Sequence, residues 1–480
     1  MLFNSFDFAI FMPVVFIVYW TLSKNVKIQN GFLLAASYFF YAWWDWRFLS
    51  LIIACATTNF AAGLLLMRNE NARIRKIILT AGCLISLGIL GFFKYYNFFV
   101  LSFCDAFRLF GADLQPHTLK LILPVGISFY TFHTLSYTID VYRRNFTPTK
   151  DIVSFFLFVS IFPLAMSGPI ERAPNLLPQI YRRRRFDYGQ LTDGLRLVLW
   201  GLFMKVVVAD RLGVYVDAVY NNAAHHNGNS LFFATIFFSF QIYCDFAGYS
   251  NMAIGIGKTL GFNFLKNFNR PILAVSVTDN WRRWHMTLSK WFKDYLYIPL
   301  GGNRCSKGRN YLNLMIVFIV SGVWHGANWT FIIWGGLNGI FQVIEKMFKK
   351  QRDQLDAFMN RTKPGATLLY IVSVCITFLL ISMTRVFFRS DNLHVACQVF
   401  KKMAIERGSL FTNNIDSIVY GLFFIVVLVV SDLLQERNKG AHFFLENKYP
   451  VVRYASYVII MLIIILFGVF DSSQFIYFQF

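Results

Sequence analysis

Long apolar runs recur along the whole chain, and no other feature constrains its fold as strongly. A helix needs about 20 predominantly apolar residues to cross a bilayer, and runs such as "YVIIMLIIILFGVF" predict about eleven crossings. Closed β-barrels also satisfy the backbone in lipid, but their strands alternate in polarity. The sequence therefore predicts an all-α polytopic membrane protein. The apolar runs lie at about 6–22, 31–66, 77–110, 119–139, 152–168, 192–216, 230–257, 310–345, 366–388, 416–433 and 452–470.

The composition excludes an ordinary soluble protein. Hydrophobic residues make up 56% of the chain and aromatic residues 19%, above the shares typical of soluble domains. The opening "MLFNSFDFAIFMPVVFIVYW" has neither a basic start nor a small-residue cleavage site. We expect it to be the first retained span and not a removed signal.

The formal net charge of +21 raises the question of a nucleic-acid partner. The basic residues, however, form short clusters between apolar runs, at 68–76, 182–185, 346–352 and 437–439. Such clusters mark the cytoplasmic ends of spans and attract anionic lipid. We therefore expect a lipid bilayer and no nucleic acid. The seven cysteines have no paired spacing, so neither a zinc site nor a disulfide framework is indicated.

A single apolar stretch, 152–170, separates two basic clusters at 142–150 and 181–186. One crossing would put these clusters on opposite faces. Because the stretch contains Pro163, Gly168 and Pro169, we expect a re-entrant or broken segment, which is tolerated where protein or water surrounds it. The alternative is an ordinary kinked span with one cluster outside.

The most polar insertion between spans runs from 267 to 304. Aromatic and apolar residues from Trp281 to Tyr295 follow helical spacing, with basic residues on the other faces. Thr278 is the expected N-cap of a helix that starts at Asp279 and ends before Pro299. We expect this amphipathic helix to lie at the membrane interface or to close a cavity.

Two histidines, His285 and His325, lie among tryptophans. An imidazole can take and return a proton near neutral pH, and polar groups at membrane depth tend to be functional. His325 is therefore either a catalytic base or a structural hydrogen-bonder. Gly322 and Gly326 would let another backbone approach closely, and Asn328 would add a hydrogen-bonding group on the same helix.

Other chemistries fit the sequence less well. No carboxylate lies at metal-ligand spacing from either histidine, and HExxH, GxSxG and Walker motifs are absent from the sequence. We predict no metal site. Asp245 lies within an apolar run and is expected to pair with a cation or to join a polar network.

The motifs at 278–304, "TDNWRRWHMTLSKWFKDYLYIPLGGNR", and at 321–339, "SGVWHGANWTFIIWGGLNG", resemble the signature region of the membrane-bound O-acyltransferase family. The resemblance is to its bacterial branch of alginate O-acetylases and teichoic acid D-alanyl transferases. It extends in order over "MLFNSFDFAIFMPVVFIVYW", "ILPVGISFYTFHTLSYTIDVYR", "SGPIERAPNLLPQI", "FQIYCDFAGYSNMAIGIGKTLGF", "TRVFFRSDNLHVA" and the closing "FIYFQF".

The resemblance implies a ring of helices around a central tunnel or funnel. It also implies that His325 is the general base and His285 its partner. Trp324, Asn328, Trp281 and Trp284 are the expected lining residues, and Asn328, Asn303 or indole N–H groups are candidate oxyanion donors. Arg282, Arg283, Lys290 and Lys293 are either interface anchors or binders of the donor's phosphates.

We expect one membrane domain over 1–480. Its parts would be N-terminal helices (1–118), a core with both motifs (119–345) and C-terminal helices (346–480). The expected activity is transfer of acetyl groups across the cytoplasmic (inner) membrane to an exported or cell-surface polysaccharide. An accessory periplasmic or extracellular acetyltransferase-like protein would take part. The donor would be acetyl-CoA or an acyl-carrier thioester at the cytoplasmic face, with no bound cofactor.

Two alternatives stay open from the sequence. One is D-alanyl transfer to teichoic acid, which the full-length pattern and the "FIYFQF" ending disfavour. The other is a transporter or flippase with a histidine proton relay, although transporters commonly contain paired halves that are not evident here.

Overall fold

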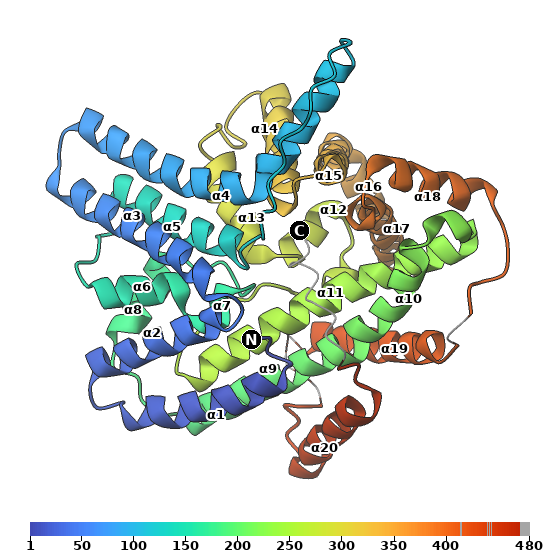
Figure 1. Cartoon of the computed structure of the whole chain (residues 1–480). Helices are drawn as coiled ribbons and strands as arrows, with labels where there is room; N and C mark the ends of the chain where they lie inside the picture. The colour runs from blue at the N-terminus through green and yellow to red at the C-terminus, as the bar shows by residue number, and fades with distance from the viewer. Residues whose placement is uncertain (413–414, 439, 441, 443, 471–480) are drawn as a thin grey trace. The chain divides into compact units, whose positions relative to one another are not determined.

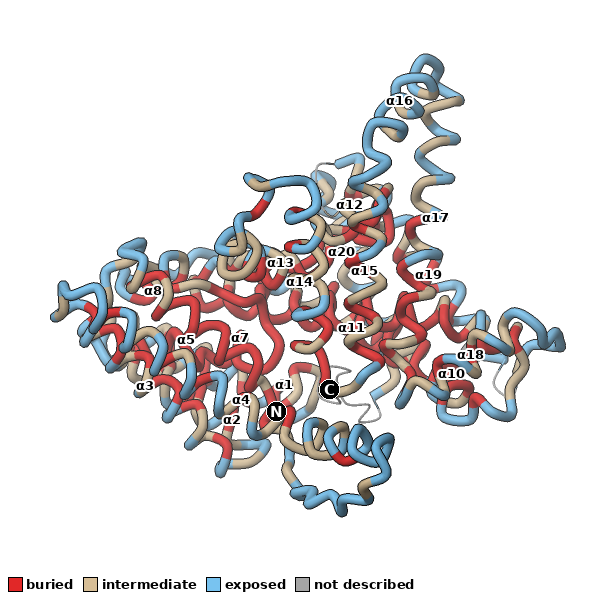
Figure 2. The backbone as a smooth tube through the Cα atoms, turned by 90° about the horizontal axis from the view of Figure 1, so that it is seen from above, coloured by how far each residue is buried: buried red, intermediate tan, exposed pale blue. Residues whose placement is uncertain are grey.

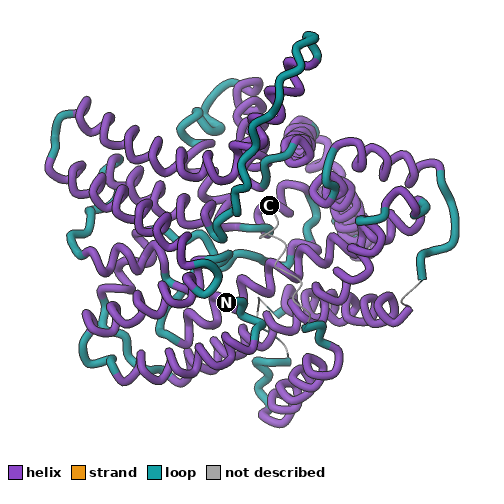
Figure 3. Tube along the Cα trace, viewed as in Figure 1, coloured by secondary structure: helices purple, strands orange, loops and turns teal. Residues whose placement is uncertain are grey.

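The computed structural model describes residues 1–412, 415–438, 440, 442 and 444–470, so the closing "FIYFQF" lies outside the described residues. Within the described part, every regular element is a helix (Figure 3). The predicted all-α class is confirmed. Figure 1 labels the elements in chain order.

The chain divides into two compact units. Unit 1 comprises Met1–Val198 and Met252–Leu265. It contains most of α9 and the end of the long helix α11 (Gly228–Thr259). Its elements are α1 (Phe6–Thr21), α2 (Val26–Ala42), η1 (Trp46–Phe48), α3 (Leu49–Arg68), α4 (Ala72–Arg108), α5 (Ile127–Tyr142), α6 (Ile152–Ser160), α7 (Phe162–Ala165), α8 (Ala173–Tyr181) and α9 (Tyr188–Leu202).

Unit 2 comprises Leu199–Asn251 and Lys266–Phe480 and holds most of α11. Both signature motifs lie in this unit. Its other elements are η2 (Phe203–Ala209), α10 (Asp210–Tyr220), η3 (Ala223–His225), η4 (Pro271–Leu273), α12 (Val277–Arg283), α13 (Met286–Phe292), η5 (Lys293–Tyr297), α14 (Lys307–His325), α15 (Trp329–Met347), α16 (Lys349–Met359), α17 (Lys363–Arg389), α18 (Leu393–Ile405), α19 (Ile415–Arg437) and α20 (Pro450–Phe467).

Six helices in the described residues are long and apolar enough to cross a membrane, and α1 is a shorter apolar helix. The most apolar window of α11 is 78% buried, whereas that of α20 is only 6% buried. Helix α11 is therefore a core element of the protein. Helix α20 presents its apolar side chains outward, as lipid contact requires. The count of eleven crossings stays a prediction. The six helices long and apolar enough to cross a membrane are Trp46–Arg68, Ala72–Arg108, Gly228–Thr259, Lys363–Arg389, Ile418–Arg437 and Pro450–Phe467.

The stretch 152–170 is broken, as predicted. Helix α6 ends at Ser160 and the four-residue α7 follows at Phe162, with Ile161 in a non-helical conformation between them. At about 1.5 Å per residue neither piece can span a hydrocarbon core of about 30 Å. Both pieces are largely buried in unit 1, which is where irregular backbone can be accommodated, and Figure 2 shows the tube at α7 in the colour of buried residues.

Asp245 pairs with a cation, as predicted. Lys205, on the π-helical turn η2, places its ammonium 2.7 Å from a carboxylate oxygen of Asp245 and 2.7 Å from one of Asp210. All three side chains are at most 5% exposed. Because an isolated charge is costly to bury, this ion triad ties η2, α10 and α11 together inside unit 2.

Candidate active site

His325 is the last residue of α14, at the tip of a helical hairpin with α15 (Figure 1). The hairpin is held by close backbone contact. A Cβ added at Gly322 would lie 2.3 Å from the carbonyl oxygen of Phe331, and one at Gly326 would lie 2.1 Å from the Phe331 ring. The prediction that a backbone approaches closely is confirmed at Gly322, whereas a side-chain ring and not a backbone approaches Gly326.

The apolar run predicted at 310–345 therefore forms two helices and not one. Asn328 lies in the break after His325, and its side chain caps α15 by accepting the N–H of Thr330 at 3.0 Å. The expectation that His325 and Asn328 share a helix is wrong, because Gly326 adopts an extended conformation that ends α14.

Aromatic rings enclose the His325 imidazole, which is 4% exposed. Its ring centroid lies 4.9 Å from that of Trp324, 5.0 Å from that of Trp334 and 5.5 Å from that of Phe388. These rings keep bulk water away from the imidazole, since Trp334 and Phe388 are themselves 6% and 2% exposed.

The predicted amphipathic helix is interrupted at the second histidine. Helix α12 is capped by Ser276 and not by Thr278, whose hydroxyl instead donates to Glu345 on α15. It ends at Arg283, and α13 begins at Met286. His285 lies in the break with a φ of +41°, a left-handed conformation that non-glycine residues adopt at a cost of about 1–3 kcal/mol. Periodicity alone did not reveal this break.

The surrounding loop holds the break in place. The N–H of Met286 donates to the carbonyl of Asn267 at 2.8 Å, and Nδ1 of His285 lies 3.0 Å from Oδ1 of the same asparagine. Asn267 donates its amide to Ser250 and therefore presents an acceptor to the imidazole. The Nδ1 nitrogen thus carries the proton. Burial lowers the pKa of His285 to about 3, so the ring is neutral at physiological pH.

Trp324 lies between the two histidines. Its ring centroid is 6.0 Å from that of His285 and 4.9 Å from that of His325. The structure therefore brings together three of the predicted site residues from two separate motifs.

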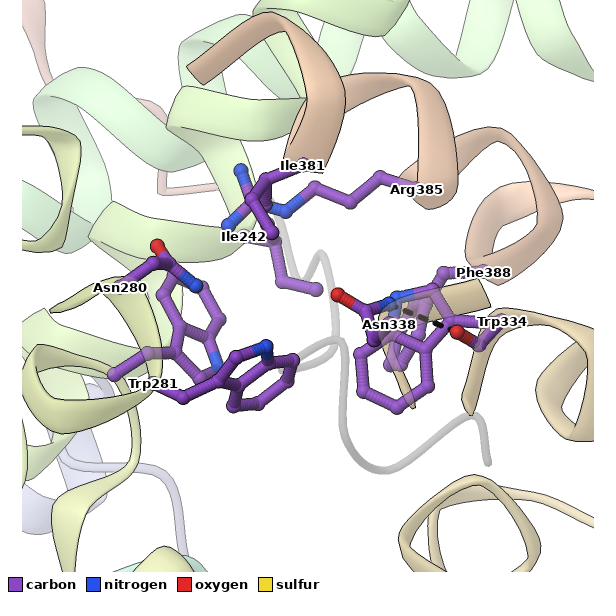
Figure 4. Close-up of a pocket in the computed structure, with 9 residues that line it drawn as sticks. Ile242, Asn280, Trp281, Trp334, Asn338, Ile381, Arg385 and Phe388 are labelled. Carbon is purple, nitrogen blue, oxygen red and sulfur yellow. Dashed lines mark hydrogen bonds between the residues drawn. The ribbon is translucent and has the colours of Figure 1, made fainter. Parts of the chain in front are cut away.

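A small cavity of about 10 Å³ adjoins this cluster (Figure 4), enough for about one water molecule. Trp334 and Phe388 belong both to its wall and to the enclosure of His325. The two predicted lining residues Trp281 and Trp284 also line it. The remaining lining residues are Ile242, Asn280, Asn338, Ile381 and Arg385.

Two predicted candidates for oxyanion donors lie elsewhere. Both polar groups of Asn328 are engaged, since its amide nitrogen also donates to the carbonyl of Asp391 at 2.6 Å. Asn303 is exposed in the turn that follows η5. Neither is among the residues that line the cavity.

The four predicted phosphate-binding residues differ in their surroundings. Arg283 forms ion pairs with Asp279 at 2.9 Å and Glu436 at 3.1 Å, which compensate its charge within the protein. Arg282, Lys290 and Lys293 are exposed. Their role in donor binding stays a prediction.

Sequence reasoning missed Asn338 and Arg385, which contribute polar groups to the cavity. Arg385 donates to the carbonyl of Ser239 at 3.2 Å, and its guanidinium lies 4.7 Å from the centre of the Trp284 ring. A usable signal was present, because a cation within an apolar run such as "CITFLLISMTRVFF" is by default a functional candidate. No group of three metal-binding side chains occurs in the part of the chain that the structure describes.

Comparison with known proteins agrees with this geometry. A model of the membrane-bound O-acyltransferase family matches residues 146–388. The "probable alginate O-acetylase" of Pseudomonas syringae pv. tomato is 37% identical over 92% of this chain and 84% of its own length. The peptidoglycan O-acetyltransferase of Helicobacter pylori is 32% identical over 100% of this chain and 98% of its own length.

A more distant relative is the teichoic acid D-alanyltransferase of Streptococcus thermophilus, which is 27% identical over 56% of this chain and 68% of its own length.

The family match and the acetyltransferase relatives, together with the apolar helices, identify a multi-pass membrane enzyme that transfers acyl groups to hydroxyls. The chain belongs to the membrane-bound O-acyltransferase family.

Proposed function

We propose that this enzyme transfers an acetyl group from a cytoplasmic thioester to a hydroxyl of an exported or cell-surface polysaccharide. The observation that carries the proposal is the placement of His325 at the tip of the α14–α15 hairpin, against the wall of the aromatic cavity. The acetyltransferases among the relatives support acetyl as the group. Family membership favours an enzyme over a transporter or flippase.

The reaction exchanges one ester for another. His325 takes the proton of the acceptor hydroxyl while its oxygen attacks the thioester carbonyl. The tetrahedral intermediate then collapses, the C–S bond breaks, and the imidazolium returns the proton to the leaving thiolate. The products are an O-acetyl ester and a thiol. A positioned base contributes about 10²- to 10⁴-fold.

The cavity suits the charge that develops on the carbonyl oxygen. The Arg385 guanidinium lies in its wall and can donate to the oxyanion. The aromatic walls exclude water and so limit hydrolysis of the donor. Since Trp334 and Phe388 separate the cavity from His325, these rings must shift for the substrates to reach the imidazole.

The donor in this proposal is acetyl-CoA or an acetylated carrier protein at the cytoplasmic face. The exposed cations Arg282, Lys290 and Lys293 would bind its phosphates. The enzyme would act in the inner membrane together with an accessory periplasmic or extracellular acetyltransferase-like protein that takes part in acetylation of the polymer.

Two acceptors follow from the relatives' names. Alginate or a similar secreted polysaccharide fits the alginate O-acetylases among the relatives, at 36–38% identity. Peptidoglycan is the second candidate because the Helicobacter pylori enzyme matches over 98% of its length. Mass spectrometry of both polymers from cells with and without the enzyme distinguishes the two acceptors. It also separates an acetyl from an alanyl ester.

The test of the catalytic role is His325→Ala. We expect incorporation of labelled acetyl into polysaccharide to fall by about 10²-fold or more, because no base remains at the hairpin tip. His394→Ala is the matched control, since His394 is exposed on α18. Equal incorporation by the two variants, at equal amounts of enzyme in the membrane, would refute the proposed mechanism.

A further inference from the structure

A groove of about 310 Å³ lies between α15, α16, α17 and the start of α12, all within unit 2. It shares no lining residue with the small cavity beside His325. On α17 its wall includes Leu369, Ser373, Ile376 and Leu380, which are spaced as one face of a helix. The rise from 369 to 380 (380 minus 369 residues, at ~1.5 Å each) is about 16 Å, close to half of a hydrocarbon core about 30 Å thick. The stripe therefore has the length of one leaflet.

This part of the groove is apolar and open to the outside of the protein. The most apolar window of α17 is only 17% buried, and Ile376 and Leu380 are 53% and 39% exposed. In a multi-pass membrane protein such an outward apolar face meets acyl chains. The groove is therefore accessible to a lipid.

The other end of the groove is polar. Its charged lining residues are Glu345 at the end of α15 and Arg352 and Asp356 on α16. Arg352 belongs to the basic cluster 346–352, which the sequence predicts at the cytoplasmic face. A ligand that fills the groove therefore has a charged end at the membrane surface and an apolar end within the bilayer, as a phospholipid has.

Two of the three charged groups at this end are paired with each other. One oxygen of Glu345 accepts from Nη1 of Arg352 at 2.6 Å, and the other accepts the N–H and the hydroxyl of Thr278 at 2.8 and 2.9 Å. Nη2 of Arg352 donates to the carbonyl of Val275 at 2.7 Å. The Glu345 carboxylate is therefore fully engaged, and the guanidinium is fixed in place with further N–H groups to offer.

The groups that can still bind a headgroup have both signs. The carboxylate of Asp356 lies 4.0 Å from Nε of Arg352 and accepts no hydrogen bond from any residue that the structure describes. The hydroxyl of Ser276 accepts the N–H of Asp279 at 3.0 Å, and within the described part of the chain its own proton goes to no acceptor. Arg352 and Ser276 can thus donate to a phosphate, while Asp356 can accept from a cation.

This combination selects among headgroups. The groove has two carboxylates and one guanidinium in its wall, so a purely anionic headgroup would meet the unneutralised carboxylate of Asp356. A choline headgroup supplies a cation but no N–H donor. An ethanolamine headgroup supplies a phosphate and a primary ammonium with three N–H donors, as in lysine.

We infer that the groove binds a phospholipid with an ethanolamine headgroup from the cytoplasmic leaflet. One acyl chain lies along α17, the phosphate binds Arg352 and Ser276, and the ammonium binds Asp356. Because Ser276 caps α12, the bound lipid links α16 and α17 to the helix that leads to His285.

Native mass spectrometry of the full-length protein in detergent tests the headgroup. The protein receives an equimolar, limiting mixture of ethanolamine, choline and glycerol phospholipids with identical acyl chains. We expect the wild type to retain the ethanolamine lipid over each of the others by roughly fivefold or more. Asp356→Asn should bring the ratio of ethanolamine to choline lipid to within about twofold of one. Asp353→Asn is the matched control on the same helix, since Asp353 is exposed outside the groove, and should keep the wild-type ratio.

A second pair of variants tests the acyl-chain part. Ile376→Trp places an indole in the groove and should reduce retention of all three lipids. Ile371→Trp is its control, because Ile371 is 52% exposed on α17 but does not line the groove. Both positions are exposed, so neither variant disturbs a packed core.

Four outcomes would overturn the inference. They are equal retention of the three lipids by the wild type, a preference for the glycerol lipid, an ethanolamine preference that survives Asp356→Asn, or equal lipid retention by the two tryptophan variants. A preference for the glycerol lipid would assign the groove to an anionic phospholipid. None of these measurements requires acetyl transfer, so their result is independent of the proposed function.

Discussion

At the scale of single residues, the two histidines occupy backbone positions that helix periodicity does not describe. His325 ends a helix, and His285 lies in a left-handed break between two short ones. Each is oriented by its neighbours, through ring contacts with Trp324 and Phe388 in the first case and through Asn267 in the second. Strained or interrupted backbone at a reactive group is typical of functional sites.

His285 makes stability depend on pH. Its pKa is about 3 in the folded protein because of burial, whereas an unperturbed histidine has a pKa of about 6.5. Between these values the unfolded chain binds a proton that the folded chain does not, so stability falls as pH falls below 6.5. From pH 7 to pH 5 we expect this group to remove up to about 2 kcal/mol of the free energy of unfolding.

Thermal unfolding in detergent at several pH values, compared between wild type and His285→Gln, measures this contribution. The variant should lose less stability on acidification, because glutamine does not titrate. His394→Gln, at an exposed site, should follow the wild type. If the wild type and His285→Gln showed parallel pH profiles, the imidazole would not be held neutral by burial.

At the scale of elements, the α14–α15 hairpin depends on glycine. A Cβ added at Gly335 would lie 2.3 Å from the carbonyl oxygen of Phe318, whereas one at the adjacent Gly336 meets nothing within 4 Å. We expect Gly335→Ala to destabilise the protein by about 1–3 kcal/mol through overpacking and to lower acetyl transfer by displacing His325. Gly336→Ala is the matched control and should retain activity. Equal melting temperatures for the two variants would contradict the close crossing.

The buried ion triad also acts at this scale. Lys205→Met leaves the carboxylates of Asp210 and Asp245 without their shared cation, and removing one partner of a buried pair costs about 3–5 kcal/mol. We expect the variant to accumulate poorly in membranes. Lys363→Met, at an exposed lysine at the start of α17, should change stability by less than about 0.5 kcal/mol. Quantitative immunoblotting and thermal unfolding compare the two, and comparable stability would show that Lys205 is not required.

At the scale of the whole molecule, the basic clusters predict which loops face the cytoplasm. We expect Arg73 and Lys350, within the clusters 68–76 and 346–352, to lie on the cytoplasmic side. Each is replaced by cysteine in a cysteine-free background, which avoids the exposed Cys375 and Cys397. An impermeant maleimide should label both only after cells are permeabilised. Labelling of either site in intact cells would reverse the predicted orientation.

The sequence by itself determined the all-α membrane class. It also identified His285 and His325 as candidate site residues and predicted that the helix in segment 152–170 is broken. Apolar run length decides whether a helix can span lipid, and proline and glycine interrupt helices through local sterics. It likewise indicated that Asp245 pairs with a cation or joins a polar network, because an unpaired buried charge is too costly.

Only the tertiary structure decided what surrounds these residues. Trp324 is adjacent to His325 in the chain, but its contact with His285 joins positions 39 residues apart (324 minus 285). One partner of Asn338, Thr384, comes from α17, and the partner of His285, Asn267, comes from the loop after α11. Side-chain periodicity specifies which face of a helix is buried, but not which element covers it. The cavity beside His325 therefore followed from packing alone.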